Sequence, residues 1–464
     1  MKTAGIIAEY NPFHNGHAYQ IRQIKKKSGA DYIVVVMSPD FVQRGEPALA
    51  DKYCRTRMAL ENGADLVLEL PVCYACGSAE YFAEGAVSLL HQLGCIDLLS
   101  FGCETGHPEL FAPLADFFLD EPEEYRQLLL KNQRQGMTFP KAREAALLSA
   151  LAQEPALLRK LWEVRMSEPA YLSESKSESE ESSGAESQLS AVSHLISSPN
   201  NILGLEYQKA VRKTGSSMKL FPIRREGSGY HSLDFEQTFC SASAVRQRLL
   251  SPAGPPSDNT GSKGSALSAF PFDSWHDLEA FLPAGSLTLL KKWQSTAGFV
   301  RFSDFSALLH YKLLSEQEYT RYLDVTSDLS DRIQNLLPGY QNPDQFVTLL
   351  KTRQMTETRI RRALLHILLN ITAQATEAYR LQGITSYARI LGFCKEAAPL
   401  LHTMKQTSRI PLITKLADAK KILSSSALQM LTQDIYASHI YQLAVTARTG
   451  SAVSSEFTHS PVIY

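Results

Sequence analysis

Short apolar runs alternate with segments of helical periodicity through the first hundred residues. The runs are TAGIIAE (3–9), YIVVVM (32–37), DLVLEL (65–70) and IDLLSF (96–101), and helices are predicted between them over 16–26, 51–61 and 78–93. A strand that is apolar at every position is buried on both faces, as in a parallel sheet covered by helices. The pattern therefore predicts an α/β fold with a Rossmann-like parallel sheet, and 218–223 (MKLFPI) is a plausible fifth strand.

The chain length and local composition predict a domain division. With 464 residues, two or three domains are expected. Residues 1–250 are assigned to the α/β domain, 251–272 to a flexible linker rich in Pro, Gly and Ser, and 273–464 to a mostly helical domain. A Ser- and Glu-rich stretch near 173–190 cannot bury a core, so we expect a flexible insert there.

Charge is distributed unevenly along the chain. Residues 285–464 contain 20 Lys and Arg against 13 Asp and Glu, although the whole chain has a formal net charge of −1. Nucleic-acid contact is therefore expected in the C-terminal part. Arg359, Arg361 and Arg362 on a predicted amphipathic helix are candidate RNA contacts, and a solvated helix face explains them equally well.

Two further features limit the location and the chemistry. No apolar run reaches the roughly 18 residues of a membrane helix, so no membrane contact and a cytoplasmic location are expected. Seven scattered cysteines argue against a disulfide framework. Cys73 and Cys76 form one CxxC pair without a closely spaced second pair, so no metal site is predicted.

The loop between the first strand and the first helix has the HxGH pattern, with His14, Gly16 and His17. Glycine permits close approach of a ligand, and the following helix N-terminus attracts anions. The histidines are candidate catalytic groups that would donate hydrogen bonds to phosphoryl oxygens. Capping or packed histidines are the alternative, and a two-histidine metal site lacks an obvious third ligand.

A second motif, SASAVR, occupies 241–246. It resembles the SxSxIR element of HxGH nucleotidyltransferases, which opens a late helix beside the triphosphate. Ser241 and Ser243 are therefore candidate phosphate-binding residues. A capped helix start with a surface arginine would give the same string.

The order of several blocks resembles the bacterial tRNA-Met cytidine acetate ligase family. The blocks are GIIAEYNPFHNGH (5–17), FVQRGEPA (41–48), GADLVLELP (63–71), FGCE (101–104), PNNILGLEY (199–207), GSGYH (227–231), SASAVR (241–246) and RILGF (389–393). The resemblance implies a cytoplasmic ligase that uses ATP, with Mg²⁺, to activate acetate as acetyl-adenylate. The acetyl group would then pass to the exocyclic amine of the wobble cytidine of elongator tRNA-Met.

The resemblance and the two motifs give a set of candidate site residues. His14 and His17 are the catalytic candidates, and Arg359, Arg361 and Arg362 are the candidate tRNA contacts. The candidate ATP site comprises Ile7, Ala8, Glu9, Tyr10, Asn11, Pro12, Phe13, His14, Asn15, Gly16, His17, Gln20, Gly102, Asn201, Arg225, Ser241 and Ser243.

Two other functions fit the motifs. A coenzyme adenylyltransferase would use the same loop, but such enzymes are generally much shorter and need no basic helical region. A non-catalytic RNA-binding protein could retain the nucleotide pocket as a scaffold. The sequence also departs from the family pattern at Ser38-Pro39-Asp40, where a serine-glycine pair is expected, and in the acidic insert.

Overall fold

The computed structural model describes residues 1–154, 156, 158, 161, 185–225, 241–250, 275–452 and 455–464. The predicted linker 251–272 and residues 173–184 of the predicted insert lie outside this part of the chain. Residues 185–190 were expected to belong to the flexible insert, but they start helix α9 (Ala185–Ser197), which buries Val192 and Leu195.

One mixed sheet organises the fold, with the strand order β10-β8-β5-β2-β1-β6-β7 and β9 paired to β8. Its N-terminal strands are parallel, as predicted: β1 (Thr3–Ala8), β2 (Tyr32–Met37), β5 (Leu66–Glu69), β6 (Leu98–Cys103) and β7 (Lys219–Arg224). Strand β8 (Ala388–Phe393) runs antiparallel to β5, and β9 (Leu412–Ile413) and β10 (Val462–Ile463) run parallel to β8.

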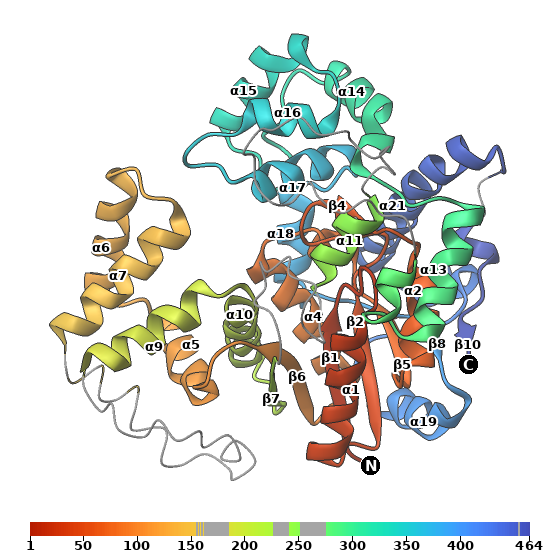
Figure 1. Ribbon diagram of the computed structural model, residues 1–464, viewed down its shortest axis with the longest axis horizontal. Helices are drawn as coiled ribbons and strands as arrows, with labels where there is room; N and C mark the ends of the chain where they lie inside the picture. The colour runs from red at the N-terminus through yellow and green to blue at the C-terminus, as the bar shows by residue number, and fades with distance from the viewer. Residues whose placement is uncertain are drawn as a thin grey trace.

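Helices cover both faces of the sheet (Figure 1). In β2, Val34 and Val36 belong to the apolar core on one face, and Ile33 and Val35 belong to the core on the other. The first face is covered by α4 (Ala79–Leu93) and α10 (Pro199–Lys213), and the second by α1 (Asn15–Ser28), α2 (Lys52–Glu61) and α13 (Ala284–Thr296). Two-sided burial explains why these strands lack polar alternation.

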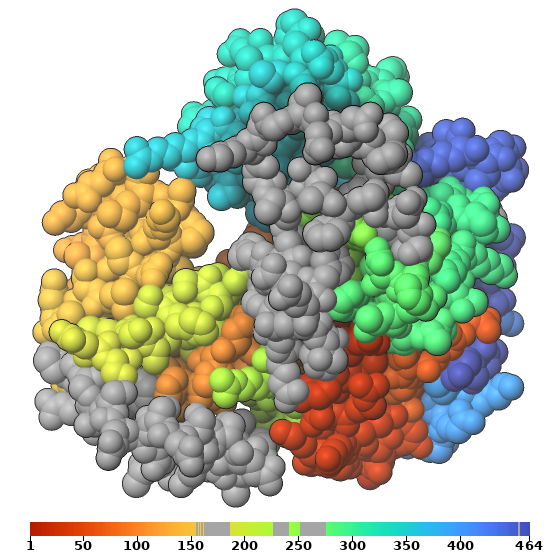
Figure 2. Space-filling model, viewed as in Figure 1, coloured from red at the N-terminus to blue at the C-terminus, as the bar shows by residue number. Residues whose placement is uncertain are grey.

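Two helical lobes extend from this core (Figure 1). One, at the left of the view, contains α5 (Phe111–Asp120), α6 (Glu123–Arg134), α7 (Phe139–Gln153) and α9. The other, at the top, contains α14 (Ser306–Leu314), α15 (Ser327–Leu336), α16 (Pro343–Leu350) and α17 (Glu357–Leu368). Figure 2 shows an open notch between the two lobes.

The other described elements are shorter or lie near the C-terminus. They are β3 (Phe41–Val42), β4 (Glu46–Pro47), α3 (Val72–Ala75), α11 (Ala242–Leu250), α12 (His276–Glu279), α18 (Ala373–Leu381), α19 (Ala398–Thr407), α20 (Ala419–Ile422) and α21 (Ser425–Thr449). None of the described helices is both long and apolar enough to span a bilayer.

The C-terminal part is mostly helical, but it is not separate from the sheet. Strands β8, β9 and β10 come from the segment that the sequence assigned to a helical domain beginning at residue 273. The N-terminal sheet extends into the C-terminal part through the pairing of β5 with β8, and the division into domains stays a prediction. The α/β fold class with a mainly parallel sheet is confirmed.

Buried ion pairs connect the C-terminal part of the chain to the sheet. The Lys52 Nζ lies 2.7 Å from a carboxylate oxygen of Glu69 and 2.9 Å from one of Glu456. The Arg389 guanidinium lies 2.8 Å from Glu69 and 2.6 Å from Glu456. The two cations lower the pKa of Glu456 below its usual value even though burial alone would raise it. Each charge in this cluster is neutralised by partners from distant parts of the chain.

Replacing Lys52 should destabilise the protein strongly. Lys52→Met leaves Glu69 and Glu456 buried beside one cation instead of two, and breaking a buried ion pair costs about 3–5 kcal/mol. Urea titration should show this loss in the free energy of unfolding. Lys25→Met is the matched control, because Lys25 pairs with Asp65 at a solvent-accessible site and should lose less than about 1 kcal/mol. Equal losses in the two variants would contradict the assigned role of the cluster.

Candidate nucleotide-binding site

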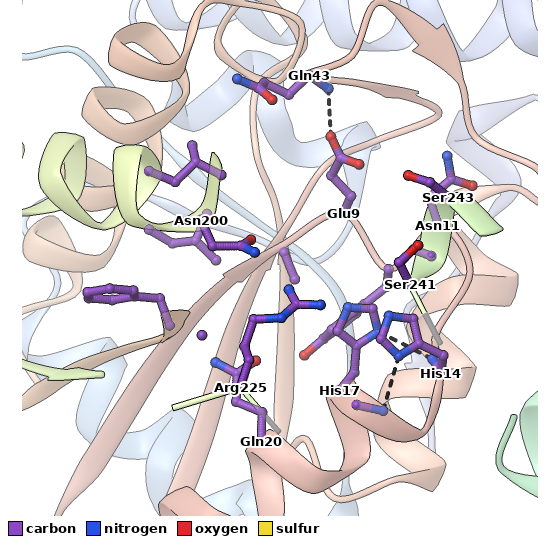
Figure 3. Close-up of a pocket in the computed structure, with 18 of the residues that line it drawn as sticks. Glu9, Asn11, His14, His17, Gln20, Gln43, Asn200, Arg225, Ser241 and Ser243 are labelled. Atoms are coloured by element: carbon purple, nitrogen blue, oxygen red, sulfur yellow. Dashed lines mark hydrogen bonds between the residues drawn. The ribbon is translucent and has the colours of Figure 1, made fainter. Parts of the chain in front are cut away.

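A pocket opens at the carboxyl ends of β1, β6 and β7 (Figure 3). Its wall includes Glu9 after β1, Gly102 in β6 and Arg225 after β7. In open parallel sheets this edge is where ligands bind. The HxGH loop and Gly102 thus contribute to one pocket. Four arginines line it, Arg44, Arg224, Arg225 and Arg246, against a single carboxylate, Glu9, so the described wall favours an anionic ligand.

The HxGH loop caps helix α1. The His14 Nδ1 accepts a hydrogen bond from the Gly16 backbone N–H (3.1 Å), and the His17 Nδ1 accepts one from the His14 N–H (3.3 Å). These bonds form a reciprocal capping box. A Cβ at Gly16 would lie 2.9 Å from the His14 ring, so glycine is required for this ring position. The first turn of α1 contains no acidic residue, which leaves its positive dipole end available to an anion.

The capping bonds determine which ring nitrogen carries the proton. Because Nδ1 accepts a hydrogen bond in both rings, neutral His14 and His17 must be protonated at Nε2. The rings stack with their centroids 3.8 Å apart at the pocket wall (Figure 3). The loop thereby presents two Nε2–H donors, the type of group that stabilises phosphoryl oxygens.

Both histidines are held in the neutral state. Burial lowers the pKa of His14 from 6.5 to about 3, and the positive charges of Arg225 and Arg246 act in the same direction. Burial also lowers the pKa of His17 well below its usual value, with further contributions from His14 and Arg225. Hydrogen-bond donation, instead of a fixed positive charge, is what this pair offers a ligand at neutral pH.

The SASAVR element lies beside the HxGH loop. The Arg246 Nη1 donates to the backbone oxygen of Asn11 (2.9 Å), and its Nη2 lies 3.4 Å from the Ser243 hydroxyl. Ser241 caps the start of α11 by accepting from the Ala244 N–H (3.2 Å). Ser241, Ser243 and Arg246 all line the pocket, although they follow the loop by more than 220 residues.

The β3–β4 hairpin and α10 contribute pocket residues that the sequence did not single out. Gln43 and Arg44 come from the hairpin, and the Gln43 backbone N–H donates to a Glu9 carboxylate oxygen (3.1 Å; Figure 3). Asn200, Leu203 and Tyr207 come from α10. Their spacing of i, i+3 and i+7 is a single helix face, which was the available sequence signal.

Comparison with known proteins identifies the family. The family described as HIGH Nucleotidyl Transferase matches residues 1–455. A protein of Thermoanaerobacter sp. (strain X514) named tRNA(Met) cytidine acetate ligase is 35% identical over 460 residues, which cover 99% of each chain. Its namesake in Acetivibrio thermocellus is 32% identical and both chains are fully covered. The chain belongs to the tRNA(Met) cytidine acetate ligase family.

Solved structures of the family share the whole fold. The crystal structure of Thermotoga maritima TmcAL bound with alpha-thio ATP has a TM-score of 0.81 and 25% identity, covering 100% of this chain and 99% of that one. The apo form of the same enzyme gives a TM-score of 0.82 and 26% identity. The resemblance stated from the sequence blocks is therefore confirmed at the level of family and fold.

Most of the predicted ATP-site residues line the pocket of this family member, and four do not. Pro12 and Phe13 are buried behind the loop, and Asn15 bonds outward to the backbone of Ala280 and Phe281. Asn201 is fully buried, and its Oδ1 accepts from the Glu104 N–H (2.8 Å) and the Thr105 N–H (3.3 Å), while its Nδ2 has no partner among the described residues. Its neighbour Asn200 lines the pocket. The assignment of Asn201 to the ATP site stays a prediction. The predicted residues that do line the wall are Ile7, Ala8, Glu9, Tyr10, Asn11, His14, Gly16, His17, Gln20, Gly102, Arg225, Ser241 and Ser243.

The three arginines proposed for tRNA lie on α17, outside the pocket. Arg361 pairs with Asp344 (2.7 Å) and Glu357 (3.2 Å), and Arg362 pairs with Asp324 (3.1 Å). Helix α17 also supports the hairpin, because Gly45 (φ 77°) packs so closely that a Cβ would lie 2.5 Å from the Arg362 nitrogen. The predicted role of these arginines in tRNA binding stays a prediction.

The state of His14 can be tested by NMR. In the ligand-free protein, the lowered pKa predicts no protonation of His14 between pH 8 and 5, since the charged form appears only towards pH 3. Its ¹⁵N spectrum should show Nε2 protonated and Nδ1 bare. An unstructured histidine peptide in the same tube should titrate near the ordinary value of about 6.5. Protonation of His14 within this window, or an Nδ1–H tautomer, would refute the proposed hydrogen-bonding state.

Proposed function

We propose that this protein activates acetate with ATP and acetylates the exocyclic amine of the wobble cytidine of elongator tRNA-Met. The observation that carries the proposal is the pair of neutral Nε2–H donors at the N-terminus of α1, inside a pocket with four arginines. Relatives that match this chain over nearly its full length are named for this activity. The T. maritima relative was crystallised with an ATP analogue.

In the first step, an acetate oxygen attacks the α-phosphorus of ATP and pyrophosphate leaves. The Nε2–H groups of His14 and His17 would stabilise charge on the phosphoryl oxygens, together with the N-terminus of α1. Arg225 and the SASAVR residues Ser241 and Ser243 would hold the remaining phosphate oxygens. No covalent enzyme intermediate is required.

Magnesium would enter as part of the Mg·ATP complex. Among the described residues, no three His, Cys, Asp or Glu side chains gather into a metal site. Mg²⁺ commonly keeps several waters and binds through substrate phosphates with one or two carboxylates. Glu9 is the one carboxylate on the described pocket wall, so the phosphates of ATP and water would supply most of the magnesium ligands.

In the second step, the cytidine N4 attacks the acetyl carbonyl carbon, and AMP leaves with the electron pair of the broken C–O bond. The attacking amine must lose one proton, and Glu9, the one carboxylate on the described pocket wall, would accept it. One Glu9 oxygen is fixed by the Gln43 N–H. Glu9 would then have two roles, one in the nucleotide site and one as the proton acceptor of the second step.

The function is tested by incubating the protein with ATP, labelled acetate and elongator tRNA-Met. Label should appear in N4-acetylcytidine at the wobble position, detected by mass spectrometry of the nucleosides. His17→Ala should reduce acetate-dependent ATP–pyrophosphate exchange by about 10²–10³-fold, because it removes one phosphoryl donor, while tRNA binding survives. Consumption of ATP on a small phosphate acceptor without tRNA labelling would indicate a coenzyme adenylyltransferase. Binding of tRNA without any exchange would indicate a non-catalytic protein.

Glu9→Gln separates the two steps. Glutamine keeps the oxygen that accepts from the Gln43 N–H but cannot take up a proton. Transfer of acetyl to tRNA should fall by roughly 10²–10⁴-fold, the usual contribution of a general base, while ATP–pyrophosphate exchange is retained. Glu61→Gln is the control, because Glu61 lies at the end of α2 outside the pocket, and it should leave both steps unchanged. An equal loss of both steps in Glu9→Gln would assign Glu9 to nucleotide binding alone.

A further inference from the structure

The tip of the α6–α7 hairpin carries an unusual combination of exposed side chains. We call residues 130–141 the arm tip; they include the end of α6, the turn through Gly136 and the start of α7. Leu130 is 53% exposed, Met137 37% and Phe139 54%. Three cations, Lys131, Arg134 and Lys141, lie exposed around these apolar groups. Single exposed apolar side chains are common on protein surfaces, whereas a group of them can mark an interaction site.

The charge at the arm tip has one sign. The chain contains no Asp or Glu from Tyr125 to Arg143. Arg126 and Arg143 at the two ends of this stretch are ion-paired, to Glu121 and Glu123 and to Glu206 respectively. Lys131, Arg134 and Lys141 form no ion pair with any residue that the structure describes. Among the described residues, no ion pair offsets the positive charge of the tip, which suits a polyanion.

The apolar groups distinguish the kinds of partner. Charged residues, lysine above all, are depleted from the cores of protein interfaces, whereas this tip interleaves three cations with its apolar groups. An exposed aromatic ring among cations is typical of surfaces that bind unpaired nucleotides, where the ring stacks on a base and the cations contact phosphates. The chemistry of the tip therefore fits RNA.

The hairpin is joined firmly to the wall of the nucleotide pocket. Arg143 on α7 lies 3.4 Å from Glu206 on α10 and stacks over the Phe118 ring at 4.0 Å. Glu144 accepts a hydrogen bond from Ser193 on α9 (2.5 Å). Glu206 directly precedes Tyr207, which lines the pocket. A ligand held at the arm tip is thus held in a defined position relative to the reaction site.

The hairpin also has a suitable reach. Helix α7 has 15 residues and is about 22 Å long. The hairpin borders the open notch between the two helical lobes (Figure 2). Contacts at its tip would therefore fall on a part of the RNA other than the base that enters the pocket.

We propose that the arm tip is a tRNA-binding site that contacts the substrate away from the wobble base. Lys131, Arg134 and Lys141 bind phosphates, and Phe139 stacks against an unpaired base. The site rests on the proposed function for the identity of its RNA. It differs from the α17 arginines, two of which are occupied by acidic partners.

The test is the triple variant Lys131→Glu/Arg134→Glu/Lys141→Glu. The KM for tRNA should rise at least tenfold, with kcat at saturating tRNA largely retained. The plot of log affinity for tRNA against log salt should lose about two to three units of slope, since each phosphate contact contributes roughly 0.7–0.9. Acetate-dependent ATP–pyrophosphate exchange needs no tRNA and reports whether the variant is folded.

The matched control is Lys405→Glu/Lys415→Glu/Lys420→Glu. It makes the same change in net charge at exposed lysines on and near α19, at the side of the molecule opposite the arm (Figure 1). Its KM for tRNA should stay within about threefold of wild type, an allowance for the weak long-range field. Equal KM values in the arm variant and this control would overturn the proposal.

Phe139→Ala tests the stacking contact without changing charge. Affinity for tRNA should fall by roughly tenfold at every salt concentration, as expected for loss of one base–aromatic stack. If Phe139→Ala instead converts a dimer to a monomer and leaves the KM for tRNA unchanged, the tip binds a second copy of the chain and the RNA site is refuted. Absence of tRNA labelling by the wild-type protein would refute the proposed function itself. The wild-type assay therefore separates failure of the proposed function from failure of the arm-tip site, which affects only the variants.

Discussion

The buried charges of Lys52, Glu69, Arg389 and Glu456 hold together segments that are far apart in sequence. Each ion alone would be costly to bury, so the cluster is stable only when all of its segments are in place. The same network reaches the loop before the β3–β4 hairpin, because Ser438 accepts from Lys52 and donates to Asp40. The hairpin supplies Gln43 and Arg44 to the pocket. The C-terminal part must therefore pack against the sheet before the hairpin can complete the pocket.

A second coupling joins helix formation to chemistry. The hydrogen bonds that start α1 use the Nδ1 atoms of His14 and His17, so the capping box also sets the tautomer of both rings. A cap of aspartate would satisfy the same backbone groups but present no donor to the pocket. Burial then keeps the rings uncharged. The HxGH pattern is therefore a helix cap whose two histidines still have Nε2–H groups to donate to a ligand.

Local patterns predicted the five N-terminal strands and the helices between them. In each of these elements the spacing of apolar residues follows from which of its faces are buried, so the spacing can be read from the sequence. The pairing of β8 with β5 was not predictable in this way. The two strands are more than 300 residues apart, and the pairing depends on a buried ion cluster that no single segment encodes. Placing single side chains is limited in another way. Adjacent residues on a helix point about 100° apart, so Asn200 lines the pocket while Asn201 is buried, and the string of residues alone does not distinguish the two positions.

The site thus divides into a part that the fold completes before any ligand binds and a part that only RNA completes. The donors, the arginines and Glu9 are positioned by caps, strand ends and the hairpin. A single cytidine offers little surface for binding, whereas contacts elsewhere on the tRNA can supply the energy to hold its amine at the activated carbonyl. Such remote contacts are useful only if their support is rigid relative to the pocket. The ion pair between Arg143 and Glu206, one residue before Tyr207, links the hairpin to the helix that lines the pocket.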